Sequence, residues 1–297
     1  MRTLRLLALV LGLLAVTALT SPWIAMVLEA VGFDFKFSRV YNRVFEVLLV
    51  VAILLGWRRL DLGSATDIGL HHPAWARDLR RGLLIGALGV GAGVAAAMLG
   101  GAMVPRLRHD VAKTIGQAVA GLLGAVIVGV GEEALFRGVL LRRFIADMGR
   151  IGGVLLSTAI YAIVHALRPG GSREAYPMAG IDRTLGLFTP LGDAGVLPSL
   201  IGLFGLGLLL AVARLRSGSL WLPIGIHAAY VAVFRVGRLL LDIRPTPVWL
   251  IGPGWPPLIG GAGGLVALAA TGALLGAALR RPAHSVAAGR HGTTAGS

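Results

Sequence analysis

The stretch TIGQAVAGLLGAVIVGVG, residues 114–131, contains eighteen residues without a charge, and EEALFRG, residues 132–138, follows it directly. An uncharged, mostly apolar run of this length is a candidate helix across the hydrocarbon core of a bilayer. A carboxylate inside that core costs about 2.5–3.5 kcal/mol or more, so ionisable residues there usually serve a function. Glu132 and Glu133 are therefore the first candidates for a functional site.

The composition of the whole chain agrees with a membrane environment. Of its 297 residues 56% are hydrophobic and 14% are charged, whereas soluble domains carry about 25% charged residues. The recurring apolar runs predict an all-α fold, a polytopic helical membrane bundle of about eight transmembrane helices. The expected spans are residues 6–28, 37–57, 82–104, 114–141, 151–167, 196–213, 217–241 and 258–279.

We interpret residues 1–281 as a single transmembrane domain with a catalytic-type core at about 114–241. Residues 282–297 have no apolar period, so we expect a disordered basic tail there. The glycine-rich stretch 260–264 is expected to be a surface on which helices pack closely. An even number of spans puts both termini on one side, and the arginine bias of the loops predicts cytoplasmic termini in a bacterial-type cell membrane.

The formal net charge of +14 comes almost wholly from arginine. In a soluble protein this balance would suggest nucleic acid as a partner. Here the arginines flank apolar runs, where they set topology and meet anionic lipid headgroups. We therefore expect the lipid bilayer, and no nucleic acid, among the partners. The chain has no cysteine, which excludes disulfides and thiolate sites.

Two other apolar stretches carry one lone histidine each, His165 and His227. Counted at 1.5 Å per residue from the expected inner interface, Glu132, Glu133 and His227 lie about 15 Å deep. His165 comes out about 20 Å deep, a difference within the error of the expected span ends. The sequence therefore predicts that three helices present these side chains in one slab of the membrane.

Helix spacing divides the two glutamates between two roles. Glu133 and Arg137 are four residues apart with the acid first, the better orientation for a helical ion pair. Glu132 points about 100° away from Glu133 and can face a polar cavity. There it could act as a general base on water. His165 could share or orient that water, and His227 could donate to a developing oxyanion.

These residues resemble the motifs of the CPBP intramembrane proteases, which include the type II CAAX prenyl endopeptidases. The family's first motif, a Glu-Glu dyad followed after three residues by Arg, is matched by Glu132, Glu133 and Arg137. Its second motif, an aromatic residue four positions before a His, is matched by Tyr161 and His165. The resemblance covers roughly residues 114–241, and eight spans agree with it.

The third family motif is a His followed four residues later by Asn or Asp, and here the chain departs from the pattern. His227 fits the first position, but Val231 stands at the second. In the family that Asn or Asp assists the oxyanion. The loss of one oxyanion donor typically costs about 2.7–4 kcal/mol of transition-state stabilisation.

The resemblance implies an intramembrane endopeptidase of the metalloprotease class that hydrolyses a membrane-anchored peptide or protein. By the same resemblance Glu132 is the water-activating carboxylate and His165 its partner. Glu133 and Arg137 organise the site, and His227 helps to hold the oxyanion.

Alternatives stay open at this stage. Glu132, His165 and His227 could instead hold a divalent metal such as zinc, since imidazoles and a carboxylate suit that ion. A catalytically weak or silent membrane scaffold or immunity-type protein of the same fold could bind a partner peptide in the same cavity. A proton-coupled transporter could use Glu132 and Glu133 as a relay, although such transporters often show inverted repeats, and we find none in the sequence.

Overall fold

The computed structural model describes residues 2–56, 64–167, 174–193, 195–244, 246–254 and 256–280. Within these residues the chain is helical almost throughout, and its one sheet has two strands. The predicted all-α fold class is therefore confirmed. The expected disordered tail, 282–297, lies outside the described residues.

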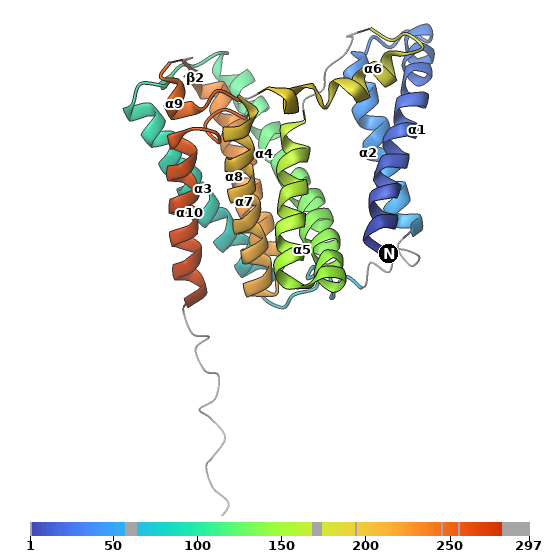
Figure 1. The fold of residues 1–297 in the computed structure, drawn as a ribbon. Coiled ribbons are helices and arrows are strands. Elements are labelled where there is room, and N and C mark those ends of the chain that lie inside the picture. Colours follow the sequence, from blue (N-terminus) through green and yellow to red (C-terminus); the bar gives the residue numbers. More distant parts are fainter. Residues whose placement is uncertain are drawn as a thin grey trace, which may run out of the picture.

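Each expected span overlaps a long helix, although the ends differ by several residues and α5 begins ten residues before its expected span. The long helices are α1 (Arg2–Ala30), α2 (Phe37–Gly56), α3 (Trp75–Leu99), α4 (Val111–Glu133), α5 (Leu141–Ala166), α7 (Val196–Ser217), α8 (Trp221–Leu240) and α10 (Ala262–Arg280). The shorter elements are β1 (Met103–Pro105), the π-helix η1 (Ala134–Leu140), α6 (Ala179–Gly186), the 3-10 helix η2 (Thr189–Gly192), β2 (Leu241–Ile243) and α9 (Val248–Ile251). The start of α1 and the end of α10 lie at the same end of the molecule (Figure 1).

Five helical stretches among the described residues are long and apolar enough to cross a membrane. They are Leu7–Ala30, Trp75–Leu99, Val111–Ala166, Val196–Ser217 and Ala262–Arg280. The third stretch is a helical run of 56 residues that contains two of the expected spans. Charged residues interrupt α2 and α8, and these two helices do not meet the same condition. A helical membrane bundle is thus confirmed, whereas the count of eight spans stays a prediction.

The fourth expected span, 114–141, is not one regular α-helix. The α-helix α4 ends at Glu133 and continues as the π-helix η1. The hydroxyl of Ser157 on α5 donates to the carbonyl of Phe136 in η1 over 3.2 Å, so a polar contact from another helix supports this segment. Single π-helical turns inside α-helices are frequent at functional sites, and this π-helix begins directly after the glutamate pair.

A sharp reversal inside α5 folds the chain back beside η1. Met148 and Gly149 are non-helical, and Gly149 has a φ of 77°, which glycine adopts without steric penalty. At Gly153 a Cβ would lie 2.5 Å from the backbone nitrogen of Ile145. The residues after the reversal therefore pack directly against those before it, which brings the end of α5 near the end of α4.

Small residues let α3, α8 and α10 approach closely, as membrane helices do without a hydrophobic driving force between them. A Cβ at Gly86 of α3 would lie 2.6 Å from the carbonyl oxygen of Ile226 on α8. The glycine-rich stretch 260–264 behaves as expected, because a Cβ at Gly260 would lie 2.9 Å from the nitrogen of Ser199 on α7. That expected packing surface is confirmed.

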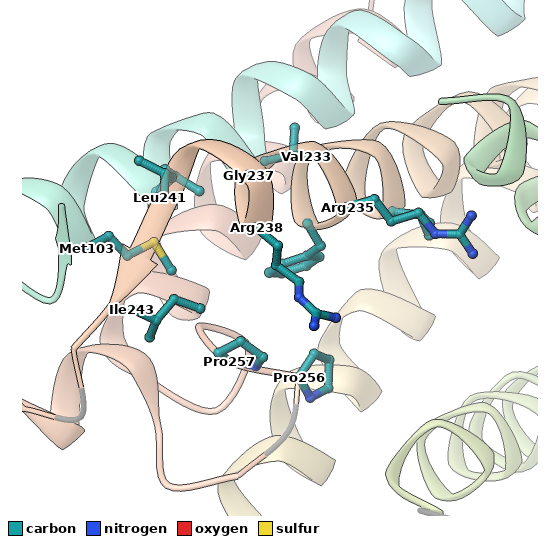
Figure 2. Close-up of a pocket in the computed structure, with 12 residues that line it drawn as sticks. Met103, Val233, Arg235, Gly237, Arg238, Leu241, Ile243, Pro256 and Pro257 are labelled. Carbon is teal, nitrogen blue, oxygen red and sulfur yellow. The ribbon is translucent and has the colours of Figure 1, made fainter. Parts of the chain in front are cut away.

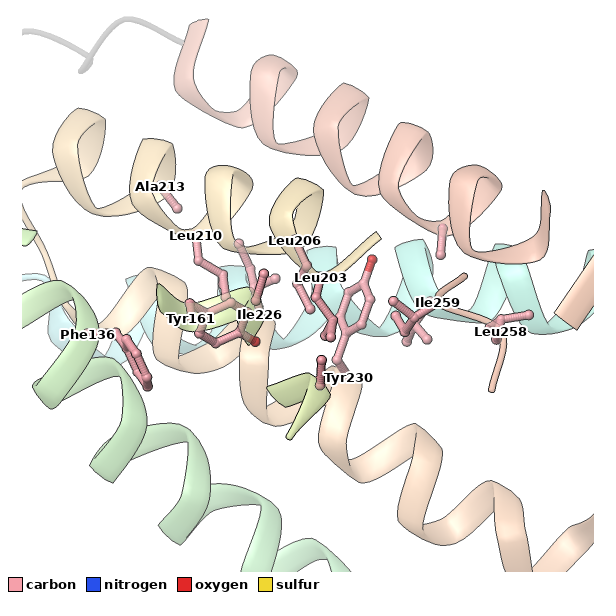
Figure 3. Packing of buried hydrophobic residues seen from close by; sticks show 14 of the residues in the cluster. Phe136, Tyr161, Leu203, Leu206, Leu210, Ala213, Ile226, Tyr230, Leu258 and Ile259 are labelled. Carbon is pink, nitrogen blue, oxygen red and sulfur yellow. The ribbon is translucent and has the colours of Figure 1, made fainter. Parts of the chain in front are cut away.

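The main core lies between α5, α7, α8 and the C-terminal segment (Figure 3). Tyr161, Tyr230 and Ile226 are each at most 1% exposed. The Tyr230 hydroxyl is hydrogen-bonded over 2.8 Å to the hydroxyl of Thr271 on α10. A second, smaller cluster joins α1, α2 and α6 around Phe37, and these helices stand beside the bundle in Figure 1.

A small two-stranded antiparallel sheet closes one end of the bundle. Strand β1 pairs antiparallel with β2, which places Met103 opposite Ile243. Asp242 of β2 accepts from Arg106 over 2.8 Å and from Arg108 over 2.6 Å. The ion pairs tie the start of the α3–α4 connection to the end of α8. The third expected span, 82–104, therefore ends in a strand, because its last residues pair with β2.

We predict that Gly86→Ala lowers thermal stability, because the added methyl group would collide with the Ile226 carbonyl. Overpacking of this kind typically costs about 1–3 kcal/mol. The matched control is Gly91→Ala on the same helix, where a Cβ meets nothing within 4 Å. Melting of the purified variants in detergent measures the effect. Equal melting temperatures for both variants would contradict the close approach of α3 and α8.

We also predict that Asp242→Asn destabilises the fold at neutral pH and not in acid. The hydrogen bond from Arg106, with the charges of Arg106 and Arg108, lowers the pKa of Asp242 below its ordinary value. A carboxyl group whose pKa is lower in the folded state than in the unfolded state stabilises the fold above about pH 4. This stabilisation is lost as the pH falls through the folded-state pKa. Melting curves of parent and variant should converge in acid. The exposed Asp34→Asn serves as control, and a difference independent of pH would refute the ion pairs as its cause.

Candidate functional site

The five side chains that the sequence predicts for one site lie together in the structure. Glu132 and Glu133 end α4, and Arg137 follows in η1. His165 comes from the last turn of α5, and His227 comes from the middle of α8. The depth estimate from the sequence, which put these residues in one slab, agrees with this arrangement.

Glu132 is the centre of the cluster. Its Oε2 lies 2.9 Å from Nε2 of His165 and 3.7 Å from Nε2 of His227. The side chains of Glu132 and His165 are 34% and 22% exposed, whereas that of His227 is 3% exposed. Part of the Glu132 side chain is therefore exposed on one side of the cluster, although its Oε2 atom is buried, and the other side is closed by α8.

Both histidines are oriented through their Nδ1 atoms. Nδ1 of His165 lies 2.9 Å from the backbone carbonyl oxygen of Tyr161, one turn earlier on α5. Nδ1 of His227 lies 2.8 Å from Oε1 of Glu133. A carbonyl and an ionised carboxylate only accept hydrogen bonds, so both Nδ1 atoms carry a proton. In the neutral rings, both Nε2 lone pairs consequently face Glu132.

This convergence of two lone pairs and a carboxylate favours a positive group between them. The three ligand atoms of Glu132, His165 and His227 all lie within 4.8 Å of one another. Zinc binds imidazole nitrogen and carboxylate oxygen at about 2.0–2.2 Å, so its ligands lie roughly 3.3 Å apart in a tetrahedron. The three residues fit a divalent cation, and they equally fit a shared proton or a bound water.

Glu133 is fully buried and holds two partners at once. Its Oε1 accepts from Nη1 of Arg137 over 3.0 Å and from Nδ1 of His227 over 2.8 Å. Helix spacing predicts the first contact, since the two residues are four apart. The second contact was missed, because the partners are 94 residues apart and no local spacing reveals which way α8 is rotated.

Arg137 is 2% exposed, and its charge is compensated on all sides. Besides the Glu133 contact, its Nη2 donates to the carbonyl of Gly207 on α7 over 3.1 Å. Its guanidinium carbon lies 4.2 Å from the ring centre of Tyr161, a cation–π contact. Buried ion pairs are tolerated only when hydrogen bonds satisfy the remaining donors. Sequence reasoning missed Gly207, which carries no polar side chain to mark it.

Neither Tyr230 nor Val231 adds a polar group to the cluster. The Tyr230 hydroxyl is bonded to Thr271, and so it is engaged on the α10 side of α8. Val231, one turn beyond His227, lines an apolar cavity of about 250 Å³. The position where the family expects Asn or Asp therefore opens into apolar space.

Comparison with known proteins identifies the segment that contains this cluster. Residues 114–233 match a family model described as type II CAAX prenyl endopeptidase Rce1-like. No curated protein and no solved structure matched the chain. The matched segment begins at the first residue of the uncharged run, and it contains all five clustered side chains and Val231. The resemblance to the CPBP intramembrane proteases is thereby confirmed over this segment, because residues 114–233 are similar to the Rce1-like family of type II CAAX prenyl endopeptidases.

Proposed function

We propose that the protein is an intramembrane endopeptidase that hydrolyses a membrane-anchored peptide or protein with water activated by Glu132. The observation that carries this proposal is the convergence of Glu132 Oε2 with Nε2 of His165 and Nε2 of His227 at 2.9 and 3.7 Å. A partly exposed carboxylate between two oriented imidazoles has the parts of a general-base site. The Rce1-like match of the surrounding helices supports the same reaction class.

The residues can divide the reaction as follows. Glu132 takes a proton from water while Nε2 of His165 orients that water, and the water oxygen forms a bond to the peptide carbonyl carbon. His227, whose Nδ1 is held by Glu133, donates from Nε2 to the oxyanion when that nitrogen carries a proton. Glu132 then returns its proton to the leaving amine as the C–N bond breaks. No covalent intermediate with the protein forms.

The same three residues fit a divalent metal, which would be held by the Glu132 carboxylate and by Nε2 of both histidines. Such an ion would polarise the substrate carbonyl and lower the pKa of a bound water. The orientation of both rings by the Tyr161 carbonyl and by Glu133 serves either version, because metal-ligating histidines usually donate their other N–H to such an acceptor.

Val231 supports a second candidate function, a catalytically weak or silent scaffold that binds a partner peptide. The residue opens into apolar space next to His227, and the neighbouring Tyr230 hydroxyl is engaged by Thr271. Neither side chain supplies the oxyanion donor that the family pattern provides, so binding could persist while turnover is slow.

For the domain organisation and the location in the cell we propose what the sequence predicts. The protein has one transmembrane domain, residues 1–281, and lies in a bacterial-type cell membrane with cytoplasmic termini. The common side of the first and last long helices (Figure 1) supports an even number of crossings.

We predict that Glu132→Gln abolishes cleavage of membrane-anchored peptides by the purified protein. General bases contribute on the order of 10²–10⁴-fold to the rate, and glutamine preserves the size of the side chain without its basicity. Mass spectrometry of a peptide library in proteoliposomes detects the products. The matched control is Glu46→Gln in α2, whose carboxylate pairs with Arg43 outside the cluster and whose loss should leave cleavage unchanged.

The same assay separates the candidate functions. If both the parent and Glu132→Gln bind a peptide and neither cleaves it, the result would favour the scaffold function and contradict the protease function. Cleavage that persists after chelation and dialysis would exclude an essential metal. Cleavage that stops with chelator and returns with added zinc would show that Glu132, His165 and His227 hold a metal ion that the reaction requires.

We predict that Val231→Asn raises the turnover number, because an amide one turn from His227 restores a donor near the oxyanion. One such donor is worth on the order of 10²–10³-fold in turnover when removed from a native site, and an engineered one should recover about tenfold. Val233→Asn is the control, since Val233 lines the same cavity from another face of α8. A Val231→Asn variant that folds normally and cleaves no faster would show that Val231 does not limit the turnover number.

A further inference from the structure

Two cavities lie side by side at the end of the bundle that carries the β1–β2 sheet. The first is the apolar cavity of about 250 Å³, lined by residues of α3, α8, both strands and Pro256 and Pro257. The second has a volume of about 350 Å³ and is lined by residues of α8, of α4 and of the connection before α4. Arg235 and Arg238 line both cavities. In Figure 2 the Arg238 side chain extends from α8 toward Pro256 and Pro257.

The lining of the second cavity is polar and includes arginines. Besides the two shared arginines its lining includes Arg108, His109 and Gln117. Among the residues that the structure describes, neither lining contains a carboxylate. Asp242, on the neighbouring strand, is held by Arg106 and Arg108. The shared arginines therefore face a space that is complementary to an anion.

The structure leaves room on α4 for one of these arginines. A Cβ at Gly124 would collide with the guanidinium of Arg235, and a Cβ at Gly121 would lie 3.4 Å from Arg235 Cβ. The side chain of Arg235 thus lies across a glycine surface of α4, and the residue remains exposed. A bulkier residue on α4 would displace the guanidinium from the mouth of the cavities.

The position along α8 fits the headgroup level of a membrane. Arg235 and Arg238 are eight and eleven residues beyond His227, or about 12 and 16 Å along the helix axis. Half of the hydrocarbon core is about 15 Å, and the sequence places His227 near the middle of the membrane. The two guanidiniums therefore lie where lipid phosphates begin, and the apolar cavity beside them continues toward the membrane interior.

We propose that this pair of cavities is a binding site for an anionic phospholipid. The phosphate lies between Arg235 and Arg238, and one acyl chain enters the apolar cavity past Val231 and Phe234. Guanidiniums bind phosphate through short, charge-assisted hydrogen bonds, so two arginines at the headgroup level suit the phosphate of an anionic lipid. The combination of a basic mouth with an apolar chamber favours a lipid over a free anion. This site does not depend on the proposed hydrolytic function.

The test measures binding of phosphatidylglycerol and phosphatidylcholine to the purified full-length protein in detergent by native mass spectrometry. The parent should bind phosphatidylglycerol more tightly than phosphatidylcholine. Removing two charges with Arg235→Gln and Arg238→Gln together should weaken phosphatidylglycerol binding about thirtyfold, at about 1 kcal/mol per arginine. The matched control is the pair Arg80→Gln and Arg81→Gln, two exposed arginines at the opposite end of the bundle, which should change binding less than about twofold.

Several outcomes would overturn the proposal. Equal binding of the two lipids by the parent would show that the headgroup charge does not contribute to binding. Equal losses in the two double variants would show only a general effect of net charge. Displacement of phosphatidylglycerol by inorganic phosphate at equal concentration would assign a free-phosphate site. Arginine-dependent binding of an apolar peptide with a free carboxyl terminus, without phosphatidylglycerol binding, would assign the cavities to a peptide.

Discussion

The arrangement of the cluster depends on the contacts that the buried carboxylate of Glu133 makes. It accepts from Arg137 and from His227 through one oxygen, and Arg137 in turn reaches the Gly207 carbonyl. Four helical segments, α4, η1, α7 and α8, are thereby fixed around one charge pair. Loss of one partner from a buried pair typically costs about 3–5 kcal/mol, because the remaining charge is left uncompensated. The neighbouring carboxylate, that of Glu132, is positioned by this framework.

Much of the site could be predicted from the sequence because charge is conspicuous in an apolar chain. Glu132, Glu133 and Arg137 interrupt or end a membrane-length run, and counting residues put His165 and His227 at a similar depth. The contact between Glu133 and His227 could not be found in this way. Depth specifies the level of a residue on its helix but not the direction in which its side chain points.

The same distinction applies to the fold: local sequence predicts some elements, whereas others depend on distant partners. Apolar runs predict where long helices lie, and the glycine-rich stretch 260–264 predicts a packing surface. The π-helix η1 and the β1–β2 sheet were not predicted, since both depend on partners from distant segments, Ser157 for one and the opposite strand for the other. Composition alone does not give the number of membrane crossings, because α2 and α8 carry charges within their length.

The spacing of Glu133 and Arg137 has a consequence for biosynthesis. Membrane helices enter the bilayer largely one after another, and a lone charge opposes entry by several kcal/mol. The counter-ion of Glu133 lies four residues further along the same helical run, so that charge can be neutralised before α5, α7 or α8 is made. Glu132 gains its histidine neighbours only later, when α5 and α8 arrive. The i,i+4 pair thus lets the segment enter lipid with Glu133 neutralised, whereas the contacts of Glu132 with His165 and His227 require the later helices.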